Sequence, residues 1–178
     1  MTPSLAWISL ALVVSQGPIK TVDGKVIEVQ RRQTPLVLIF TSTDCPIAKA
    51  YSPTLSSLVK RYPNVQFVCV YEDPDASSKA IARHQSEFHI PMAAVLDHGT
   101  KIADWLGATT TPEAVLLTKA GATSYKGRID DTYASIERRR YAATSHDLAD
   151  AIQQVLKDQP VKHPYFAPVG CAIFRGKS

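Results

Sequence analysis

One cysteine, Cys45, occupies a position in this sequence that favours chemistry. It lies in the stretch FTSTDCPIAKAY, after an apolar run and directly before Pro46. Proline is favoured in the first turn of a helix, because its missing N–H would have no partner there. Cys45 therefore falls at a predicted helix N-terminus, where free backbone N–H groups and the helix dipole favour the thiolate. A thiolate is the nucleophilic form of cysteine, so we predict that Cys45 is a redox nucleophile.

The surroundings of Cys45 also allow a purely structural role. Asp44 stands beside it, and a nearby carboxylate raises the pKa of a thiol. A cysteine at the end of a buried strand can equally be an inert, small hydrophobic side chain. We interpret Cys69, inside the apolar run FVCVY, in this second way. For Cys45 we favour the functional interpretation, because a helix start is a position that activates a thiol.

Metal and cofactor chemistry have weaker signals. The cysteines Cys45, Cys69 and Cys171 are too far apart in the sequence for a zinc knuckle. No histidine stands at zinc-motif spacing with a cysteine pair, and we expect His84, within a helical pattern, to be solvated. The sequence therefore predicts neither a bound metal nor a cofactor.

The elements that must position Cys45 alternate between strand and helix. Residues 35–40 form a continuous apolar run, which is typical of a strand covered on both faces. Apolar residues then recur every three or four positions over 47–62, which predicts an amphipathic helix, kinked where Pro53 interrupts it. A second apolar strand is predicted at 65–71. This order predicts a βαβ unit with two parallel strands.

The remaining pattern completes an α/β domain. Asp23-Gly24 predicts a two-residue turn in an N-terminal hairpin over 18–29. The further predicted elements are a helix from Asp75 or a following serine to Phe88, a strand over 92–97, a short helix ending at Gly107, an antiparallel hairpin over 113–129 and a helix over 145–158. Beyond them, prolines and glycines predict an extended or irregular tail. The expected fold class is an α/β sandwich with a mixed sheet.

Composition limits the function classes. The chain has 178 residues, a net charge of +4 and 45% hydrophobic residues, which fits one globular domain. Part of the positive charge is the cluster Arg138-Arg139-Arg140, which we interpret as a solvated face. Aromatic and basic residues are not interleaved as a nucleic-acid-binding face requires, so we expect no nucleic-acid partner.

The N-terminus has the pattern expected of a targeting signal. Its apolar run, 5–14, is too short to span a bilayer but suits the central region of a signal peptide. No basic residue precedes Lys20, so a buried or partner-covered helix is the alternative. We predict a bacterial-type signal peptide over 1–15 and an extracytoplasmic protein, periplasmic or secreted. Contact with a membrane would then occur only through an uncleaved leader. In such a compartment disulfides persist.

The stretch around Cys45 and three further segments of the sequence resemble a known protein family. The stretch LVLIFTSTDCPIAKAY resembles the active-site strand, turn and helix of the thioredoxin-like superfamily, and most closely its redoxin branch, the alkyl hydroperoxide reductase and thiol-specific antioxidant family. Thr111-Pro112 in GATTTPEAVLL resembles the cis-proline loop that faces the active cysteine. The stretches SYKGRIDD and VDGKVIEV are similar to the closing and N-terminal hairpins of redoxins. The similarity covers residues 18–160.

The resemblance implies a thioredoxin-like three-layer sandwich, with a central mixed β-sheet flanked by helices. It implies a redoxin domain over 16–160, followed by a tail over 161–178 that carries Cys171. It also implies that Cys45 is catalytic. The residues that it places in contact with substrate are Ser42, Pro46, Thr111 and Pro112.

Two positions depart from the related patterns. Thioredoxins carry a second cysteine three positions after the first, and here that position is Ala48. Peroxiredoxins carry a proline where this chain has Leu38, although Ser42 can supply their hydroxyl group. The stretch PVGCAI places Cys171 in a flexible tail with glycine and proline, 126 residues after Cys45, and a mobile tail can bring a resolving thiol to a distant nucleophile. The alternatives are that Cys171 is merely exposed or that it pairs between chains.

Three functions compete. The first is a thiol-disulfide oxidoreductase in which Cys45 attacks a partner disulfide and Cys171, or an external thiol, resolves it. The second is a thiol peroxidase that reduces hydroperoxides through a Cys45 sulfenic acid. The third is a copper-binding protein that uses Cys45 with Cys171 or a histidine. The expected partners are protein thiols and disulfides or hydroperoxides, together with an external thiol reductant.

Overall fold

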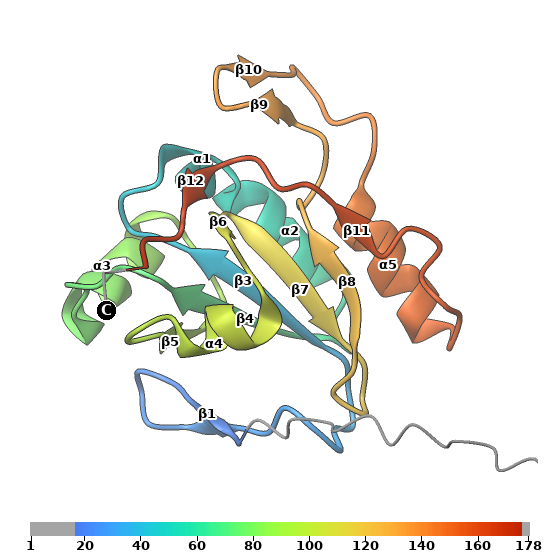
Figure 1. The fold of residues 1–178 in the computed structure, drawn as a ribbon, viewed down its shortest axis with the longest axis horizontal. Coiled ribbons are helices and arrows are strands. Elements are labelled where there is room, and N and C mark those ends of the chain that lie inside the picture. Colours follow the sequence, from blue (N-terminus) through green and yellow to red (C-terminus); the bar gives the residue numbers. More distant parts are fainter. Residues whose placement is uncertain (1–16, 176–178) are drawn as a thin grey trace, which may run out of the picture.

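The computed structural model describes residues 17–175, so the predicted signal peptide lies outside the described residues. Its centre is a six-stranded mixed sheet (Figure 1). The strands, in spatial order, are β11 (Tyr165–Phe166), β8 (Thr123–Gly127), β7 (Glu113–Leu117), β3 (Leu36–Thr41), β4 (Gln66–Tyr71) and β5 (Ala93–Leu96). The expected fold class is therefore confirmed.

The apolar runs of the sequence form the middle of this sheet. Strands β3, β4 and β5 are parallel, and β7 pairs antiparallel with the other edge of β3. All six residues of β3 are buried, as expected for a strand covered on both faces. The predicted βαβ unit and the predicted hairpin of β7 and β8 are both present.

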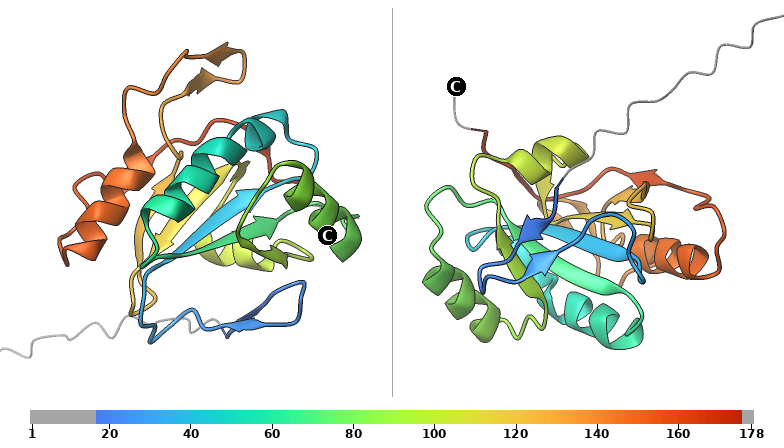
Figure 2. Two further views of the ribbon diagram at one scale, coloured as in Figure 1. Left: turned by 180° about the vertical axis from the view of Figure 1, so that it is seen from behind. Right: turned by 90° about the horizontal axis from the view of Figure 1, so that it is seen from below.

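Two layers cover the sheet, as the views in Figure 2 show. One core cluster lies between the sheet and four helices: α1 (Pro46–Ala50), α2 (Ser52–Arg61), α3 (Ser78–Glu87) and α5 (Asp147–Leu156). The second cluster lies on the other face, beneath α4 (Lys101–Leu106) and a hairpin of β1 (Ile19–Lys20) and β2 (Val26–Ile27). Every described helix is too short or too polar to cross a membrane.

The helix predicted over 47–62 is broken. It consists of α1 and α2, which meet at Tyr51, and Pro53 lies in the first turn of α2. A proline has no N–H to donate to the preceding helical turn, so the hydrogen-bond ladder is interrupted there. The expected cap of α3 is Ser77, whose Oγ accepts from the Ala80 N–H at 3.1 Å.

The prediction of a two-residue turn at Asp23-Gly24 is wrong. The turn between β1 and β2 spans five residues, and the Thr21 N–H donates to the Lys25 carbonyl at 2.9 Å. Gly24 adopts a φ of 85° within it, and its N–H donates to Thr21. The longer turn is stabilised by the Thr21 hydroxyl, which donates to the carboxylate of Asp23.

Two further segments lie at the end of the sheet where α1 begins. A hairpin of β9 (Tyr133–Ser135) and β10 (Arg138–Arg139) rises above the body of the protein in Figure 1. The tail is more ordered than the sequence predicted. It first adds β11 to the edge of the sheet and then runs to β12 (Cys171–Ala172), which pairs with β6 (Thr110–Thr111).

Candidate active site

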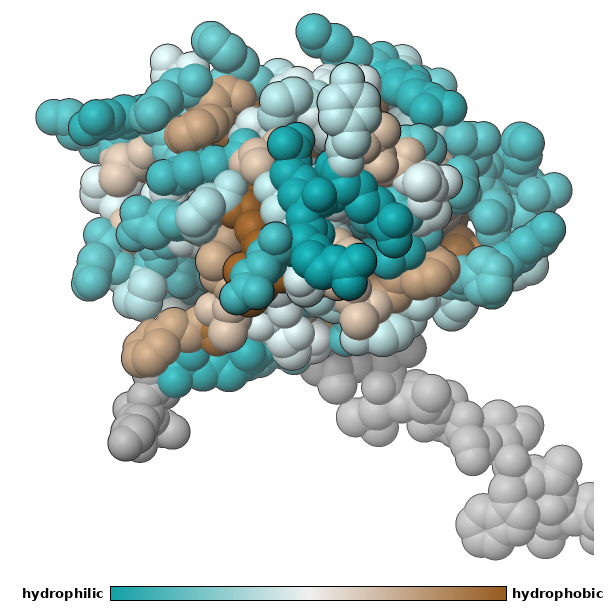
Figure 3. Space-filling model, turned by 90° about the horizontal axis from the view of Figure 1, so that it is seen from above, coloured by the Kyte–Doolittle hydropathy of each residue, from teal (hydrophilic) through white to brown (hydrophobic). Residues whose placement is uncertain are grey.

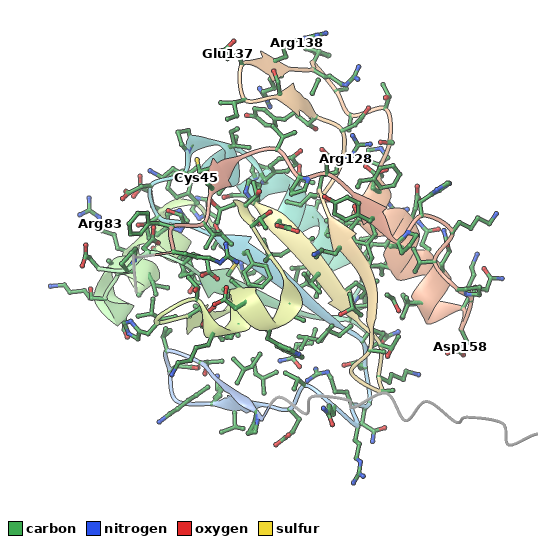
Figure 4. The ribbon with its side chains drawn as sticks, in the orientation of Figure 1. Cys45, Arg83, Arg128, Glu137, Arg138 and Asp158 are labelled. Atoms are coloured by element: carbon green, nitrogen blue, oxygen red, sulfur yellow. The ribbon has the colours of Figure 1, made fainter. Side chains whose placement is uncertain are left out.

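Cys45 lies at the junction that the sequence predicted. It follows β3 and is the N-cap residue of α1, with Pro46 in the first helical turn. Its side chain is 2% exposed, and its Sγ lies 3.0 Å from the carbonyl oxygen of Thr111. Figure 4 shows Cys45 at the end of the molecule beneath the β9–β10 hairpin. The residue is thus held at a helix start and covered by protein.

The loop before β7 forms the wall opposite Cys45. The peptide bond between Thr111 and Pro112 is cis, as expected from the resemblance. Glu113, which is buried, fixes this loop because its carboxylate accepts from the backbone N–H groups of Thr109 at 2.8 Å and Thr110 at 3.1 Å. The loop therefore presents Thr111 to Cys45 in a defined position.

The tail brings the second thiol to this site. Cys171 is in register with Thr111 in the antiparallel pair of β12 and β6, and Ala172 is in register with Thr110. The Cys171 S–H donates to Cys45, and the two Sγ atoms are 2.7 Å apart. The two thiols thus lie side by side although 126 residues separate them along the chain.

Two glycines allow the tail to lie this close. A Cβ on Gly170 would come within 2.7 Å of the Thr111 carbonyl carbon and 3.1 Å of Pro112 Cδ. A Cβ on Gly127 would meet the backbone of Phe166 in the same way. Only glycine permits such an approach of two backbones, so these positions determine the path of the tail.

The electrostatics of the two thiols differ. Burial disfavours the Cys45 thiolate, but hydrogen bonds from the Cys171 thiol and the Ala48 N–H hold the Cys45 pKa below its ordinary value. Burial and the neighbouring Cys45 raise the pKa of Cys171 to about 11. Cys45 is therefore the thiol that ionises first, which is the property that a nucleophile needs.

Ser42, which was expected to contact substrate, is hydrogen-bonded to Asp73. Its hydroxyl donates to the carboxylate of Asp73, and the Thr43 N–H donates to the same carboxylate at 2.8 Å. The Asp44 N–H in turn donates to Ser42 Oγ at 3.1 Å. This network fixes the turn that leads into Cys45. Asp73 was not among the predicted site residues, although its position just after β4, beside the end of β3, was a usable signal.

Two other polar side chains, Tyr51 and His84, have buried hydrogen-bond partners. The Tyr51 hydroxyl, six residues after Cys45, donates to Asp130 Oδ1 at 2.7 Å. This bond joins the helix junction to the chain that follows β8. The expectation that His84 is solvated is wrong, because His84 is buried and its Nδ1 lies 3.0 Å from the Tyr71 hydroxyl. His84 shares with Ile81 the face of α3 that packs on the sheet.

Cys69 has the inert environment that the sequence predicted. It is buried in β4, and burial raises its pKa to about 12. Within residues 17–175, no group of three or more His, Cys, Asp and Glu side chains is arranged to hold a metal ion. The copper hypothesis therefore rests on the two thiols alone.

The fold and the paired strands define a class of protein: a thioredoxin-like domain of the redoxin branch, as the sequence resemblance implied. Residues 16–134, more than half of the chain, match the model of the AhpC/TSA family. The chain therefore belongs to the AhpC/TSA family. No curated protein matches it.

Solved structures share the fold. An uncharacterized conserved protein from Geobacillus kaustophilus has a TM-score of 0.78 at 21% identity, with 91% of this chain and 90% of that chain covered. A hypothetical protein from Sinorhizobium meliloti has a TM-score of 0.76 at 19% identity, covering 89% of this chain and 90% of that one. A secreted disulfide oxidoreductase of Mycobacterium tuberculosis, homologous to E. coli DsbE, has a TM-score of 0.57 at 21% identity, with 78% and 95% covered.

Proposed function

We propose that the protein is a thiol-disulfide oxidoreductase in which Cys45 is the nucleophile and Cys171 is the resolving thiol. The observation that carries this proposal is the separation of 2.7 Å between the two Sγ atoms. A disulfide forms only between cysteines that the fold already brings together. Here the tail strand supplies the partner that the local motif lacks, since Ala48 stands where thioredoxins have their second cysteine.

The reaction follows from the different ionisation of the two thiols. The Cys45 thiolate attacks one sulfur of a substrate disulfide, and the S–S bond breaks. One substrate thiolate leaves and takes up a proton. Cys171 then loses its proton and attacks the Cys45 sulfur of the mixed disulfide, which releases the second substrate thiolate. The substrate gains two electrons, and the protein is left with a Cys45–Cys171 disulfide that an external thiol must reduce.

The residues around Cys45 have supporting roles in this proposal. Pro46 starts α1, so that the backbone N–H groups of its first turn face the thiolate. Ser42 holds the preceding turn through Asp73. Thr111 and Pro112 form the wall on which an extended substrate can lie when the tail is lifted from it.

Extracytoplasmic location is part of the proposal. The signal peptide over 1–15 remains a prediction, and the similar protein from M. tuberculosis is described as secreted. An oxidising compartment would allow a Cys45–Cys171 disulfide to persist between reaction cycles. We also keep the redoxin domain at 16–160 and the tail at 161–178 as predicted boundaries.

The test is turnover of a model disulfide with an external thiol as the reductant. We expect Cys45→Ser to lose all activity, because no other described thiol has a lowered pKa. In a single mixing without external thiol, Cys171→Ser should form the mixed disulfide once and then stop, because no second thiol is present to resolve it. Cys69→Ala is the matched control and should keep its activity. Equal activity of Cys45→Ser and the wild type would overturn the proposal.

A thiol peroxidase is the second candidate, and the same pair of sulfurs favours it. The Cys45 thiolate would attack a hydroperoxide, the O–O bond would break, and an alcohol or water would leave. Cys171 would then condense with the Cys45 sulfenic acid and release water. Leu38 and the engagement of the Ser42 hydroxyl with Asp73 oppose this candidate. Peroxide consumption no faster than that by free cysteine would exclude it.

A further inference from the structure

The two sulfurs of the pair face different surroundings, and this difference bears on how the oxidised protein is reduced. Cys45 is 2% exposed, whereas Cys171 is partly exposed. Building on the proposed function, we propose that an external thiol reduces the Cys45–Cys171 disulfide by attacking Cys171, through the cleft between the β9–β10 hairpin and the tail. The first mixed disulfide therefore forms on Cys171 and not on the nucleophile Cys45.

Attack on Cys45 is blocked by protein. A thiolate attacks a disulfide sulfur in line with the bond that breaks, from the side opposite to the leaving sulfur. Cys45 is part of the buried core, and its Sγ contacts the carbonyl oxygen of Thr111, in the loop before β7, at 3.0 Å, so an external thiol meets protein on its way to this sulfur. The loop is covered in turn by the tail, since Cys171 and Ala172 pair with it and the Ile173 N–H donates to Thr109 at 2.9 Å.

The tail residues directly before Cys171 line an open cleft. A cleft of about 400 Å³ is lined by three hairpin residues and by the three tail residues that precede Cys171. These residues are Ser135, Ile136, Glu137, Pro168, Val169 and Gly170. Figure 4 shows Glu137 and Arg138 on the hairpin above the end of the molecule that holds Cys45. A small thiol in this cleft therefore contacts the chain directly before Cys171.

The hairpin beside this cleft carries two exposed cations next to Glu137, which lines the cleft. Figure 3 looks onto this end of the molecule and shows strongly hydrophilic side chains over its middle, next to smaller hydrophobic areas. Arg138 and Arg139 are exposed on the hairpin and take part in none of the ion pairs found within residues 17–175. Ile136 at the hairpin turn is 65% exposed. Unpaired cations attract an anionic ligand from solution.

The chemistry of the leaving sulfur also favours attack on Cys171. The external thiolate bonds to Cys171 Sγ, the bond to Cys45 breaks, and the electron pair leaves on Cys45. A sulfur with a lowered pKa is the better leaving group, and Cys45 is that sulfur. A second external thiol then attacks the external sulfur of the mixed disulfide and releases Cys171, which takes up a proton. Two external thiols become one disulfide, and the protein gains two electrons.

The reduced protein can still react through Cys45. Once the disulfide is open, β12 is held by backbone pairing over two residues and by the contacts of its neighbours. Short terminal strands open locally at a small cost in free energy. Substrate would thus meet Cys45 after the tail lifts, while reductant meets Cys171 with the tail in place.

Acid quenching of the reduction identifies the sulfur that is attacked. The full chain, oxidised to the Cys45–Cys171 disulfide, is mixed with excess glutathione, quenched in acid and digested with pepsin at low pH. Mass spectrometry then locates the glutathione. Cys45→Ser and Cys171→Ser, each loaded with oxidised glutathione, supply the reference peptides. We expect at least about tenfold more glutathione on Cys171 than on Cys45.

The outcomes separate the two proposals. Glutathione found equally on both cysteines, or mainly on Cys45, would overturn the inference and leave the proposed function intact. If the Cys45–Cys171 disulfide never forms, the proposed function itself fails.

A cleft variant tests the route. Ser135→Trp fills the cleft and should slow reduction by glutathione about tenfold, whereas Lys119→Trp, in the exposed turn between β7 and β8, should not. Reduction of Ser135→Trp at the wild-type rate would show that the thiol does not use the cleft.

Discussion

At the scale of single residues, Cys171 influences the pKa of Cys45 before a disulfide forms between them. Its S–H group donates to the Cys45 sulfur, and a hydrogen bond to the ionised form of a group lowers that group's pKa. Burial acts in the opposite direction on the same sulfur. The ionisation of Cys45 should therefore respond to a change at position 171, far away in the sequence.

The pair Cys171→Ala and Cys171→Ser tests this coupling. Alanine removes the donor, so the pKa of Cys45 should rise, while the hydroxyl of serine keeps a donor and should keep the pKa below its ordinary value. Thiolate absorbance, followed against pH in the reduced proteins, measures the shift. An unchanged first titration step in Cys171→Ala would contradict the coupling.

Glu72 is a second residue whose titration can be predicted. It is 6% exposed, neither carboxylate oxygen has a hydrogen-bond partner among residues 17–175, and burial raises its pKa to about 8. The folded protein therefore holds a proton that the unfolded chain releases near pH 4.5. This contribution to stability is complete below about pH 4.5 and is lost as the pH rises towards 8.

Glu72→Gln should remove that pH dependence. The variant should match the wild type near pH 4.5 and be more stable near pH 8, by on the order of 2 kcal/mol. Denaturant unfolding at the two pH values provides the measurement. Glu137→Gln, a change at an exposed carboxylate on the hairpin, is the control and should alter neither value. Greater stability of the wild type at the higher pH would contradict the prediction.

At the scale of elements, the strand β12 brings the second thiol to the site. It is two residues long, and its position depends on the close approach of Gly170 to the loop of Thr111 and Pro112. Such a strand has no periodicity of its own and little free energy apart from its contacts. The position of Cys171 is therefore determined by the contacts of β12 with β6 and with the loop of Thr111.

A methyl group at position 170 should displace β12. Gly170→Ala should keep the fold but slow the formation of the Cys45–Cys171 disulfide by about tenfold or more, because the added Cβ cannot fit beside Thr111. The rate of thiol loss after one equivalent of oxidant measures this effect. Gly17→Ala, where a Cβ would meet nothing within 4 Å, is the matched control. Equal rates in all three proteins would show that the tail approaches Cys45 without this contact.

The sequence predicted the parts of the site that local signals encode. An apolar run, a cysteine and a proline identified the end of β3 and the start of α1, and Thr111-Pro112 identified the facing loop. The pairing of β12 with β6 was not predictable in this way, because it is a contact between distant segments. His84 was misjudged because its neighbours along α3 are polar, and only its spacing from Ile81 shows that it faces the sheet.

At the scale of the whole molecule, the tail closes a domain whose core is nearly complete without it. Ile173 is the only residue after 160 that is counted among the buried hydrophobic residues of 17–175. The tail crosses the end of the sheet and covers the active-site loop (Figure 1). It therefore combines two roles, a cover over Cys45 and the support of Cys171.

Removal of residues 161–178 should separate these roles. The shortened protein should fold with a loss of at least about 2 kcal/mol, since it loses the burial of Ile173 and also the edge strand β11 with its partly buried Phe166. Its Cys45 should be alkylated faster than in full-length Cys171→Ser, which lacks the same thiol but keeps the cover. Unfolding curves and alkylation rates provide the two measurements. Equal alkylation rates would mean that the tail does not shield Cys45.

The most direct test of the proposed mechanism is disulfide mapping. The reduced protein is treated with one equivalent of peroxide or of a model disulfide, and its peptides are examined by mass spectrometry. The mechanism predicts a peptide in which Cys45 is linked to Cys171, with Cys69 still a free thiol. Cys45 found as a thiol, a sulfenic acid or a mixed disulfide, with Cys171 unlinked, would contradict it.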